Sequence, residues 1–339
     1  MDFVVTRAPF RISFAGGGTD LSSFYEREYG AVVSTTIDKY VYVMINRCRP
    51  IFDGGIDDPV RYKIRLSYSS TENVQTLDQL KHPIVREALR MLDMDIPMDI
   101  ATMADIPSGN GLGSSGTFTV ALLHALHLLK GDKVTAERLA AEAANIEINV
   151  LGRPVGKQDH YAAAYGGLNA INFMGDGEVK VRPIHTDNGL REKLFSSLLL
   201  LYTGMSRNAS DVLAEQRDNT ESILDELLII REHAHELERL FENGFNLKNF
   251  GNILHGNWMR KRSLASRITN DQIDSWYDRA MDAGALGGKL CGAGGGGFLL
   301  LVVDPAKRSA VREVLGEMSE LGFSYEAQGS QGLLPANQD

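Results

Sequence analysis

Alternating apolar and polar positions, with many β-branched residues, predict that the first third of the chain is rich in strands. The predicted strands are Phe3–Phe14, Ala31–Arg47, Arg61–Ser67 and Pro97–Met103. The segment Thr117–Lys130 is apolar and ends at Gly131, a pattern typical of a buried helix. In a second predicted helix, Thr135–Val150, four apolar residues share one face. They are Leu139, Ala143, Ile146 and Val150.

The rest of the chain alternates helical segments with short apolar strands. A hairpin is predicted first, with strands Gly167–Phe173 and Glu178–Pro183 joined by a Gly-Asp-Gly turn. The later predicted strands are Ser197–Thr203, Phe298–Val303 and one near Phe323–Ala327, and the helices are Ser210–Asn243, Leu247–Ala265, Asp271–Ala283 and Pro305–Leu321. Strands and helices mixed without strict βαβ repetition predict an α+β fold rather than a doubly wound sheet. We expect two domains, residues 1–188 and 189–339.

The composition fits a folded globular protein and narrows the choice of partners. The 339 residues are 43% hydrophobic and 23% charged, and 35 basic against 44 acidic side chains give a net charge of −9. This acidic balance argues against a nucleic-acid partner. Two cysteines cannot form a disulfide framework, the N-terminus lacks a signal-peptide pattern, and the longest strongly apolar run, Phe298–Val303, is far too short for a membrane span. We therefore expect a cytoplasmic protein with no membrane partner. Its oligomeric state, homodimer or otherwise, stays open.

Glycine is the residue whose placement changes the picture. Many of the 34 glycines fall in three clusters, at residues 15–20, 107–116 and 284–297. Each cluster lies between apolar, periodic segments, which argues against flexible linkers. Tight turns or close backbone packing explain any single cluster equally well.

The cluster at 107–116 has the form of an anion-binding loop. A predicted strand precedes it and a helix beginning at Ser114 follows it, so the unpaired N–H groups of the first helical turn would gather around one point. Glycines at 109, 111 and 113 permit a positive φ and let a phosphate approach the backbone. The cluster matches neither a Walker A loop nor a dinucleotide-binding loop. The plain alternative is a helix capped by Ser114 after a flexible turn.

These clusters resemble the motifs of the GHMP small-molecule kinases, a family that includes galactokinase, homoserine kinase and mevalonate kinase. Residues 107–116 are similar to the family's Pro-x-x-x-Gly-Leu-Gly-Ser-Ser-Ala loop, with Gly116 in place of the usual alanine. Residues 8–20 resemble the N-terminal motif, and residues 289–297 resemble the third motif. The resemblance implies an N-terminal, ATP-binding domain of the ribosomal-protein-S5 type, a ferredoxin-like C-terminal domain, and an active site between them.

The resemblance also implies roles for individual residues in phosphoryl transfer from ATP. The residues expected to bind the ATP phosphates are Pro107, Gly109, Gly111, Leu112, Gly113, Ser114, Ser115 and Gly116. Ser115 and Glu147 match the family's Mg²⁺ ligands, and Glu142 is the competing carboxylate. Asp159 matches an aspartate that accepts the proton of the acceptor hydroxyl in some members. Arg11 would hold that carboxylate ionised, and a simple ion pair is the alternative for it.

The expected substrate is a sugar or a sugar phosphate. Residues 11–21 and 150–159 resemble the D-glycero-D-manno-heptose 7-phosphate kinases, which phosphorylate the C1 hydroxyl to give the 1,7-bisphosphate for nucleotide-activated heptose synthesis. The expected substrate-binding residues are Gly17, Gly18, Thr19, Asp20, Arg153, Lys157, Arg207, Gly294 and Gly295, with Lys289 as a further candidate for the existing phosphate. The alternatives are a fucokinase-like or other sugar kinase, a decarboxylase of the same fold, and a non-catalytic nucleotide-binding protein.

Overall fold

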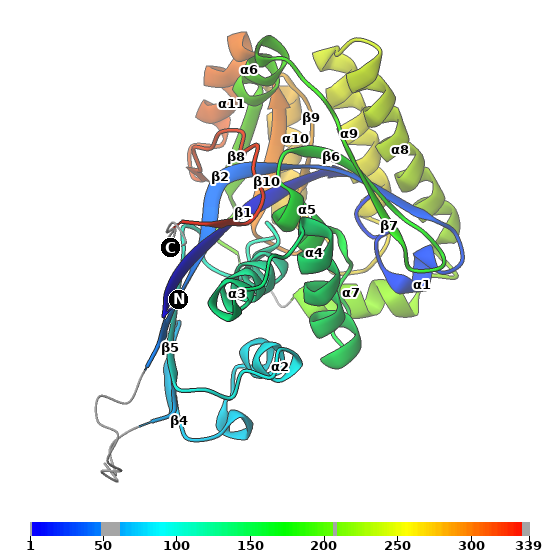
Figure 1. The fold of residues 1–339 in the computed structure, drawn as a ribbon. Helices are drawn as coiled ribbons and strands as arrows, with labels where there is room; N and C mark the ends of the chain where they lie inside the picture. The colour runs from blue at the N-terminus through cyan, green and yellow to red at the C-terminus, as the bar shows by residue number, and fades with distance from the viewer. Residues whose placement is uncertain (1, 49–61, 206–208, 334–339) are drawn as a thin grey trace, which may run out of the picture.

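The computed structural model describes residues 2–48, 62–205 and 209–333, which form two sheets covered by helices (Figure 1). The first sheet is built on two long antiparallel strands, β1 (Phe3–Ala15) and β2 (Gly30–Arg47). Its further strands are β3 (Ile64–Ser67), β4 (Thr71–Val74), β5 (Met98–Ala104), β6 (Leu168–Phe173), β7 (Val179–Pro183) and β12 (Gln331–Gly332). The strand order is β12-β1-β2-β5-β3-β4, and the hairpin β6-β7 pairs with the first half of β2.

Helix α3 (Ser114–Lys130) packs against β1 and β2, with other short helices around it. These are α2 (Pro83–Met91), α4 (Ala136–Ala144) and α5 (Gln158–Tyr165). Most of α3 is buried, which explains its apolar sequence. Gly113, with φ 85°, and Gly131, with φ 87°, flank it in the left-handed conformation that favours glycine. Gly113 therefore caps the start of α3, at the end of the predicted anion-binding loop that follows β5.

A π-helical segment, η2 (Asn145–Val150), continues α4 and changes which residues face inward. Its wider turn buries Glu147, which is 1% exposed, and leaves Val150 53% exposed. The prediction that Val150 shares the buried face of a regular helix is therefore wrong. The same change of register brings Glu147 toward the N-terminus of α3.

The second sheet has the antiparallel order β11-β8-β10-β9. Its strands are β8 (Leu198–Tyr202), β9 (Ala285–Leu290), β10 (Phe298–Val303) and β11 (Ser319–Glu320). Alternate residues of β8 and β10 enter different cores, which explains why both strands are apolar throughout. Leu200 and Leu300 join Phe14 of the first sheet, whereas Leu199 and Leu299 face the opposite side. A shared core thus holds the two sheets together.

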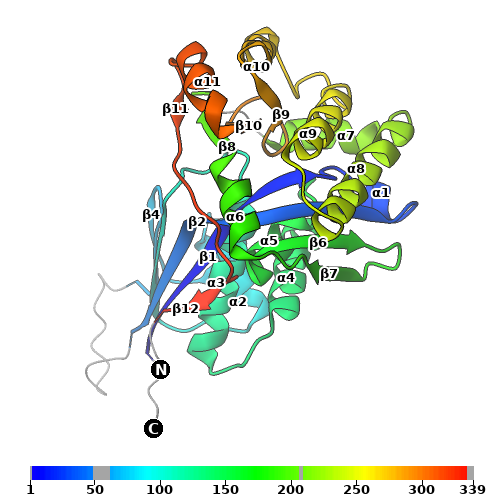
Figure 2. The same cartoon turned by 90° about the horizontal axis from the view of Figure 1, so that it is seen from above.

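Most of the remaining helices belong to the second half of the chain. They are α1 (Ser22–Tyr25), α6 (Asn188–Ser196), α7 (Ala209–Asp218), α8 (Leu224–Glu242), α9 (Leu247–Lys261), α10 (Asp271–Asp282) and α11 (Arg308–Val314), with 3₁₀ turns at Leu77–Gln79 and Pro305–Lys307. Helices α8 and α9 pack on the side of β1 and β2 opposite α3 (Figure 2). None of the helices in the described part of the chain is long and apolar enough to cross a membrane.

After β11 the chain returns to the first sheet instead of ending in the second one (Figure 1). The backbone N–H of Asp38 donates to the carbonyl of Ser324 at 3.0 Å, and Tyr325 forms an isolated bridge with Ile37. Strand β12 then pairs antiparallel with β1. The C-terminal segment therefore completes one edge of the N-terminal sheet.

The α+β class and the two-domain architecture are confirmed, and three predicted elements differ. The helix expected over Ser210–Asn243 is two helices, since the chain turns at residues 219–223, where the Thr220 hydroxyl donates to the carbonyl of Gln216. The helix expected to reach Leu321 ends at Val314, just before Gly316. The segment 323–327 forms only the single bridge to Ile37. The start of the strand predicted at Arg61 lies outside the described residues.

Candidate active site

The segment between β5 and α3 forms a tight loop that depends on its glycines. The angle φ is 83° at Gly109, 80° at Gly111 and 85° at Gly113, all in the left-handed region. Leu112 is fully buried, and its carbonyl accepts the backbone N–H of Arg11 at 3.2 Å, which fixes the loop to β1. The first turn of α3 follows directly, and its N–H groups have no partner within the helix. Together with the helix dipole they form a site suited to an anion.

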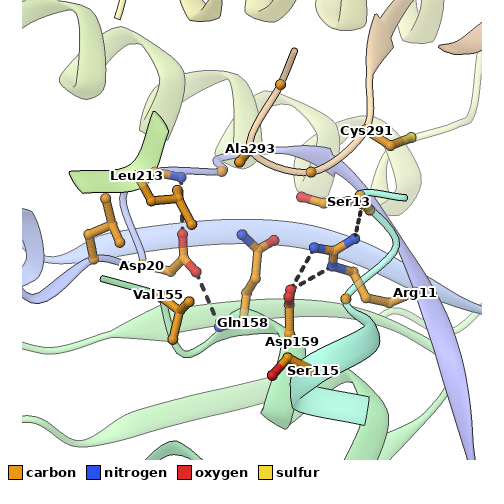
Figure 3. A pocket seen from close by; sticks show the side chains of 18 of the residues that line it. Arg11, Ser13, Asp20, Ser115, Val155, Gln158, Asp159, Leu213, Cys291 and Ala293 are labelled. Atoms are coloured by element: carbon orange, nitrogen blue, oxygen red, sulfur yellow. Dashed lines mark hydrogen bonds and ion pairs between the residues drawn. The ribbon is translucent and has the colours of Figure 1, made fainter. Parts of the chain in front are cut away.

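A cavity of about 180 Å³ lies beside this turn, and all three glycine clusters line it (Figure 3). Its lining includes Gly17, Gly18 and Asp20 from the first cluster, Gly109, Gly111, Gly113, Ser114 and Ser115 from the second, and Gly294 and Gly296 from the third. Three loop residues with predicted roles lie elsewhere, and the first of them, Leu112, is buried in the core that the two sheets share. Pro107 lines a neighbouring cavity, and Gly116 faces the backbone of α5. Gly295 lies outside the lining, and its N–H donates to the carbonyl of Ile268 at 2.8 Å.

The third cluster packs backbone to backbone against the second. A Cβ added to Gly111 would lie 2.4 Å from the carbonyl oxygen of Cys291. A Cβ added to Gly292 would lie 2.3 Å from the Cα of Gly111, and one added to Gly297 would lie 2.4 Å from the carbonyl oxygen of Asn110. No side chain fits at these contacts, so the glycines allow the C-terminal half of the chain to close over the loop.

Arg11 and Asp159 form an ion pair at the cavity wall. Arg11 projects from β1 and donates from Nε to Asp159 Oδ1 at 2.8 Å, with Nη2 2.6 Å from the same oxygen. Its Nη1 donates to the carbonyl of Gly111 at 2.9 Å. The other carboxylate oxygen of Asp159 lies 3.2 Å from the position a Cβ would take on Gly113. Arg11 thus ties Asp159, in the first turn of α5, to the phosphate loop, and the carboxylate faces the cavity (Figure 3).

Glu147 and Ser115 form the second polar cluster. The Ser115 hydroxyl donates to Glu147 Oε2 at 2.5 Å, and the Thr119 hydroxyl donates to Oε1 at 2.9 Å. His160 Nε2 lies 3.1 Å from Oε1, and Arg153 Nη1 donates to both Ser115 Oγ and Glu147 Oε2 at 2.9 Å. Burial alone would raise the pKa of Glu147. The hydrogen bond and the charge of His160, together with the hydrogen bonds from Ser115 and Thr119, outweigh burial and lower this pKa to about 2. The carboxylate is therefore ionised at neutral pH.

The donor set of this cluster fits a magnesium ion shared with phosphates. Ser115 Oγ and Glu147 Oε2 are hard oxygen ligands at the N-terminus of α3, where ATP phosphates are expected. The side chains in the described ranges form no group of three or more His, Cys, Asp or Glu suited to a metal, so the remaining ligands would be phosphate oxygens and water. Glu142, the competing carboxylate, instead binds His127 Nε2 and Arg138 Nε, each at 2.7 Å.

Asp20 holds the first glycine cluster in shape as well as lining the cavity. Its Oδ1 accepts the N–H of Gly18 at 3.0 Å and its Oδ2 accepts the N–H of Gln158 at 3.2 Å (Figure 3). Burial, followed by the charge of Asp159, raises the pKa of Asp20. Thr19 is fully buried behind the loop, where its hydroxyl donates to the carbonyl of Gly16 at 2.8 Å. Each Asp20 oxygen keeps a further acceptor position for a ligand.

The basic residues predicted to hold a substrate phosphate lie in different places. Arg153 contacts the Ser115–Glu147 cluster, and Lys157 Nζ donates to the carbonyl of Gly177 at 2.9 Å beside a separate cavity. Arg207 lies outside the described residues. Lys289 lines the central cavity, but its ammonium donates to the carbonyls of Ser13, at 2.7 Å, and Phe14, at 3.3 Å. Of the four, only Lys289 is seen to line the central cavity.

A second cavity, of about 430 Å³, was not anticipated from the sequence. It meets the first one at Gly109, Ser114 and Ser115. The apolar and aromatic residues that line it come from separate segments: Phe10, Val41, Tyr68, His82, Ile84, Met103, Ile106 and Phe118. An apolar cavity joined to an anion site suits a planar base with phosphates attached. No local motif marks these residues, because the fold assembles them from distant positions.

Sequence reasoning also missed several polar residues of the central cavity, among them Lys261 on α9 and Gln216 on α7. Gln216 is 2% exposed, and its Nε2 has no hydrogen-bond partner among the described residues. It lies 2.2 Å from the position a Cβ would take on Gly18. A polar residue on an amphipathic helix gives no sign of its role, so only the packing of α7 and α9 over the first cluster identifies these two.

Comparison with known proteins identifies the family of the chain. The model of the GHMP kinases N terminal domain matches residues 82–167, and that of the GHMP kinases C terminal domain matches residues 234–321. The chain is 31% identical to the D-glycero-alpha-D-manno-heptose 7-phosphate kinase of Campylobacter jejuni, over 96% of this chain and 98% of the relative. It is 26% identical to the L-fucokinase/L-fucose-1-P guanylyltransferase of Bacteroides fragilis, over 92% of this chain and 36% of that longer protein.

Solved structures show the same fold. A D-glycero-D-manno-heptose 1-phosphate kinase from Bacteroides thetaiotaomicron has a TM-score of 0.79 and 24% identity, covering 98% of this chain and 100% of its own. Lactococcus lactis galactokinase complexed with galactose has a TM-score of 0.73 and 19% identity, covering 97% and 95%. Three findings lead to the same family: the full-length similarity to a relative at 31% identity, the matches to both domain models, and the glycine loops that line one cavity. The chain belongs to the GHMP kinase family and is a sugar kinase that transfers a phosphoryl group to a hydroxyl.

Proposed function

We propose that this kinase uses ATP to phosphorylate the anomeric C1 hydroxyl of D-glycero-D-manno-heptose 7-phosphate, forming the 1,7-bisphosphate for nucleotide-activated heptose synthesis. The observation that carries the proposal is the position of Asp159, whose carboxylate faces the cavity beside the phosphate loop and Asp20. The Campylobacter jejuni relative, similar over nearly the full length of both chains, supports the choice of sugar. In this proposal residues 1–188 carry the ATP site, and residues 189–339 close the sugar site.

The loop before α3 and its first turn bind the ATP phosphates in this proposal. Their N–H groups meet the oxygens, and the apolar cavity beside Phe118 takes the adenosine. Mg²⁺, held by Ser115 and Glu147, would neutralise phosphate charge during transfer. Because Glu147 is buried and ionised, it presents a fixed anionic ligand at this point. Arg153, which bridges the same two oxygens, adds a positive charge close to the phosphates.

Asp159 acts as the base in the transfer step. Phosphoryl transfer depends on positioning and charge stabilisation, and a carboxylate near the attacking hydroxyl orients it and accepts its proton. Arg11 holds Asp159 through two nitrogens and also contacts the loop carbonyl of Gly111. The base and the phosphate loop are therefore kept in a fixed relation.

Asp20 and Gln216 are the proposed contacts to sugar hydroxyls. Asp20 has spare acceptor positions, and Gln216 contributes a buried amide nitrogen that lacks a partner in the described structure. An acceptor and a donor that both lie next to Gly18 suit hydroxyl groups, which both donate and accept.

The test is a comparison of substrates with the purified protein, ATP and Mg²⁺. We expect turnover of heptose 7-phosphate to exceed that of L-fucose at equal concentrations, with the 1,7-bisphosphate identified by ³¹P NMR. Equal or faster turnover of fucose would replace the heptose assignment with the fucokinase one, which the Bacteroides fragilis relative represents. Release of carbon dioxide from a mevalonate diphosphate would instead indicate the decarboxylase of this fold.

A variant tests the role of Asp159 separately. We expect Asp159→Asn to lower kcat by at least ~100-fold, since the amide cannot accept the proton. ATP binding should remain, because asparagine has the shape of aspartate and, among the described residues, the hydrogen bonds of the Asp159 side chain reach the loop through Arg11. Transfer at the parent rate would remove the base assignment and reopen the reading of the chain as a non-catalytic nucleotide-binding protein.

A further inference from the structure

Three polar side chains converge on the space above Gly17. A Cβ added to Gly17 would lie 3.7 Å from Gln158 Nε2, 3.8 Å from Lys261 Nζ and 3.9 Å from Ser13 Oγ. These side chains come from α5, α9 and β1, and all of them line the central cavity. Gly17 itself lies between them with no side chain. The arrangement leaves room for a ligand group surrounded by three polar ends.

The charge of Lys261 is not balanced by an ion pair in the part of the chain that the structure describes. The residue is 5% exposed, and its ammonium donates to the carbonyl of Gly292. Among the described residues it forms no ion pair, since Asp159 pairs with Arg11, and both Asp20 oxygens accept backbone N–H groups. Burial lowers the pKa of Lys261 to about 8, so the ammonium form still prevails at neutral pH. A buried cation with only a carbonyl for a partner favours an anionic ligand.

The other two side chains also have unused hydrogen-bonding capacity. Ser13 is 5% exposed, and its hydroxyl has no partner among the described residues. Gln158 stands between Asp20 and Asp159 (Figure 3), and its donating end, Nε2, is the one that lies 3.7 Å from the Cβ position of Gly17. An ammonium, a hydroxyl and an amide NH₂ all donate hydrogen bonds. A phosphoryl group, whose oxygens only accept, matches three such donors better than a sugar hydroxyl does.

We propose that Ser13, Gln158 and Lys261 form an anion subsite above Gly17 that binds a phosphoryl group during the reaction. The inference rests on the proposed function, because it concerns the substrate of the same site. The bound phosphoryl group has two candidate sources: the phosphate that the sugar already carries, and the group in transit from ATP. The three side chains would replace the water around that group with fixed donors.

Two substitutions test the subsite without removing the fold. Lys261→Met removes the charge and keeps the length of the side chain. Gly17→Ala places a methyl group in the subsite at ordinary contact distances, and Gly17 does not have the left-handed backbone that would make alanine strained. Both variants should therefore keep the thermal unfolding midpoint of the parent. Lys248→Met is the matched control, because Lys248 is an exposed lysine on the same helix, α9.

The first measurement is calorimetric titration with inorganic phosphate while ADP fills the nucleotide site, which leaves the position of the group in transit open to the phosphate. We expect Lys261→Met and Gly17→Ala to weaken phosphate binding at least ~10-fold, the loss expected when a charge-assisted donor is removed, and Lys248→Met to bind like the parent. This measurement does not depend on which sugar is phosphorylated. If the parent enzyme fails to turn over heptose 7-phosphate, the proposed function fails while the subsite is still tested. Unchanged phosphate binding in both variants overturns the subsite.

The second measurement identifies the source of the phosphoryl group by steady-state kinetics of Lys261→Met. A KM for heptose 7-phosphate raised at least ~30-fold, with the KM for unphosphorylated heptose unchanged, assigns the subsite to the sugar's own phosphate. A fall in kcat of that size for both sugars, with both KM values unchanged, assigns it to the group in transit. If kcat and KM stay within about threefold of the parent for both sugars, the subsite has no part in the reaction and the inference is wrong.

Discussion

Gly116→Ala would restore the residue that is usual in this loop, and we expect it to impair this enzyme. Gly116 lies in the first turn of α3, against the start of α5. An added Cβ would lie 2.8 Å from the Cβ of Asp159 and 3.2 Å from the backbone N of His160. Ordinary contact begins at 3.4 Å, so the two helices must separate by about 0.6 Å. The atom that must move belongs to the proposed base itself.

The stability change is small, and the catalytic change is larger. Alanine in a helix is favoured over glycine by about 1 kcal/mol, whereas forcing an extra methyl into a packed contact costs about 1–3 kcal/mol. The net loss in the free energy of unfolding should therefore be at most about 2 kcal/mol. A misplacement of about 1 Å costs roughly 100-fold in rate, so a shift of this size should lower kcat at least ~10-fold. The change should fall mainly on kcat, because the shift displaces the Asp159 carboxylate.

Urea unfolding and steady-state kinase assays measure the two effects. Gly189→Ala is the control, because this exposed glycine lies in the first turn of α6 and meets only the side chain of Asp187, at 3.4 Å. We expect the control to keep the parent kcat and to be as stable as the parent or more so. A Gly116→Ala enzyme with the kcat and stability of the parent would refute the close packing of α3 on Asp159.

Three further predictions concern the metal, the nucleotide and the pH. Glu147→Gln should raise the Mg²⁺ concentration for half-maximal rate at least ~10-fold, measured by Mg²⁺ titration at fixed ATP. Phe118→Ala should raise the KM for ATP about tenfold and leave the sugar KM unchanged, since it removes apolar surface from the adenosine cavity. Burial alone would lower the pKa of His127, but its hydrogen bonds with Glu142 and Asp132 raise it above 6.5. The stability that protonated His127 contributes is thus complete below pH 6.5 and is lost as pH rises through the folded-state pKa. In urea unfolding, His127→Gln should therefore lower the free energy of unfolding least at high pH. A difference that stays constant from pH 6 to 9 would contradict it.

The glycine clusters made most of the site predictable. Their sequence places a strand before, and a helix after, the loop at 107–116, and positive φ angles at Gly109, Gly111 and Gly113 are a local property that sequence reports well. Asp159 and Arg11 were predicted as a pair from resemblance, and the structure brings them within 2.8 Å. Local conformation and family motif were sufficient for these residues.

The remaining residues depend on tertiary packing. Glu147 was chosen over Glu142 from the sequence, yet only the π-helical segment explains how it reaches Ser115. Lys157 lies within the motif at residues 150–159, but its side chain turns toward the carbonyl of Gly177. Lys261 lies on an ordinary amphipathic helix, and its burial results from the docking of α9. Side-chain direction and helix docking are set by contacts far apart in the chain, so sequence pattern alone does not reveal them.

The pairing of β12 with β1 has a consequence for biosynthesis. Arg7 and Gln331, which hydrogen-bond at 3.0 Å across these strands, lie 324 residues apart. While the chain is being synthesised, β12 leaves the ribosome more than 300 residues after β1, so this edge of the sheet lacks its partner for all of that time. A chain that ends before β12 would keep that open edge permanently and would be prone to aggregate, whereas adding a peptide of residues 322–333 in trans should cover the edge and reduce the aggregation.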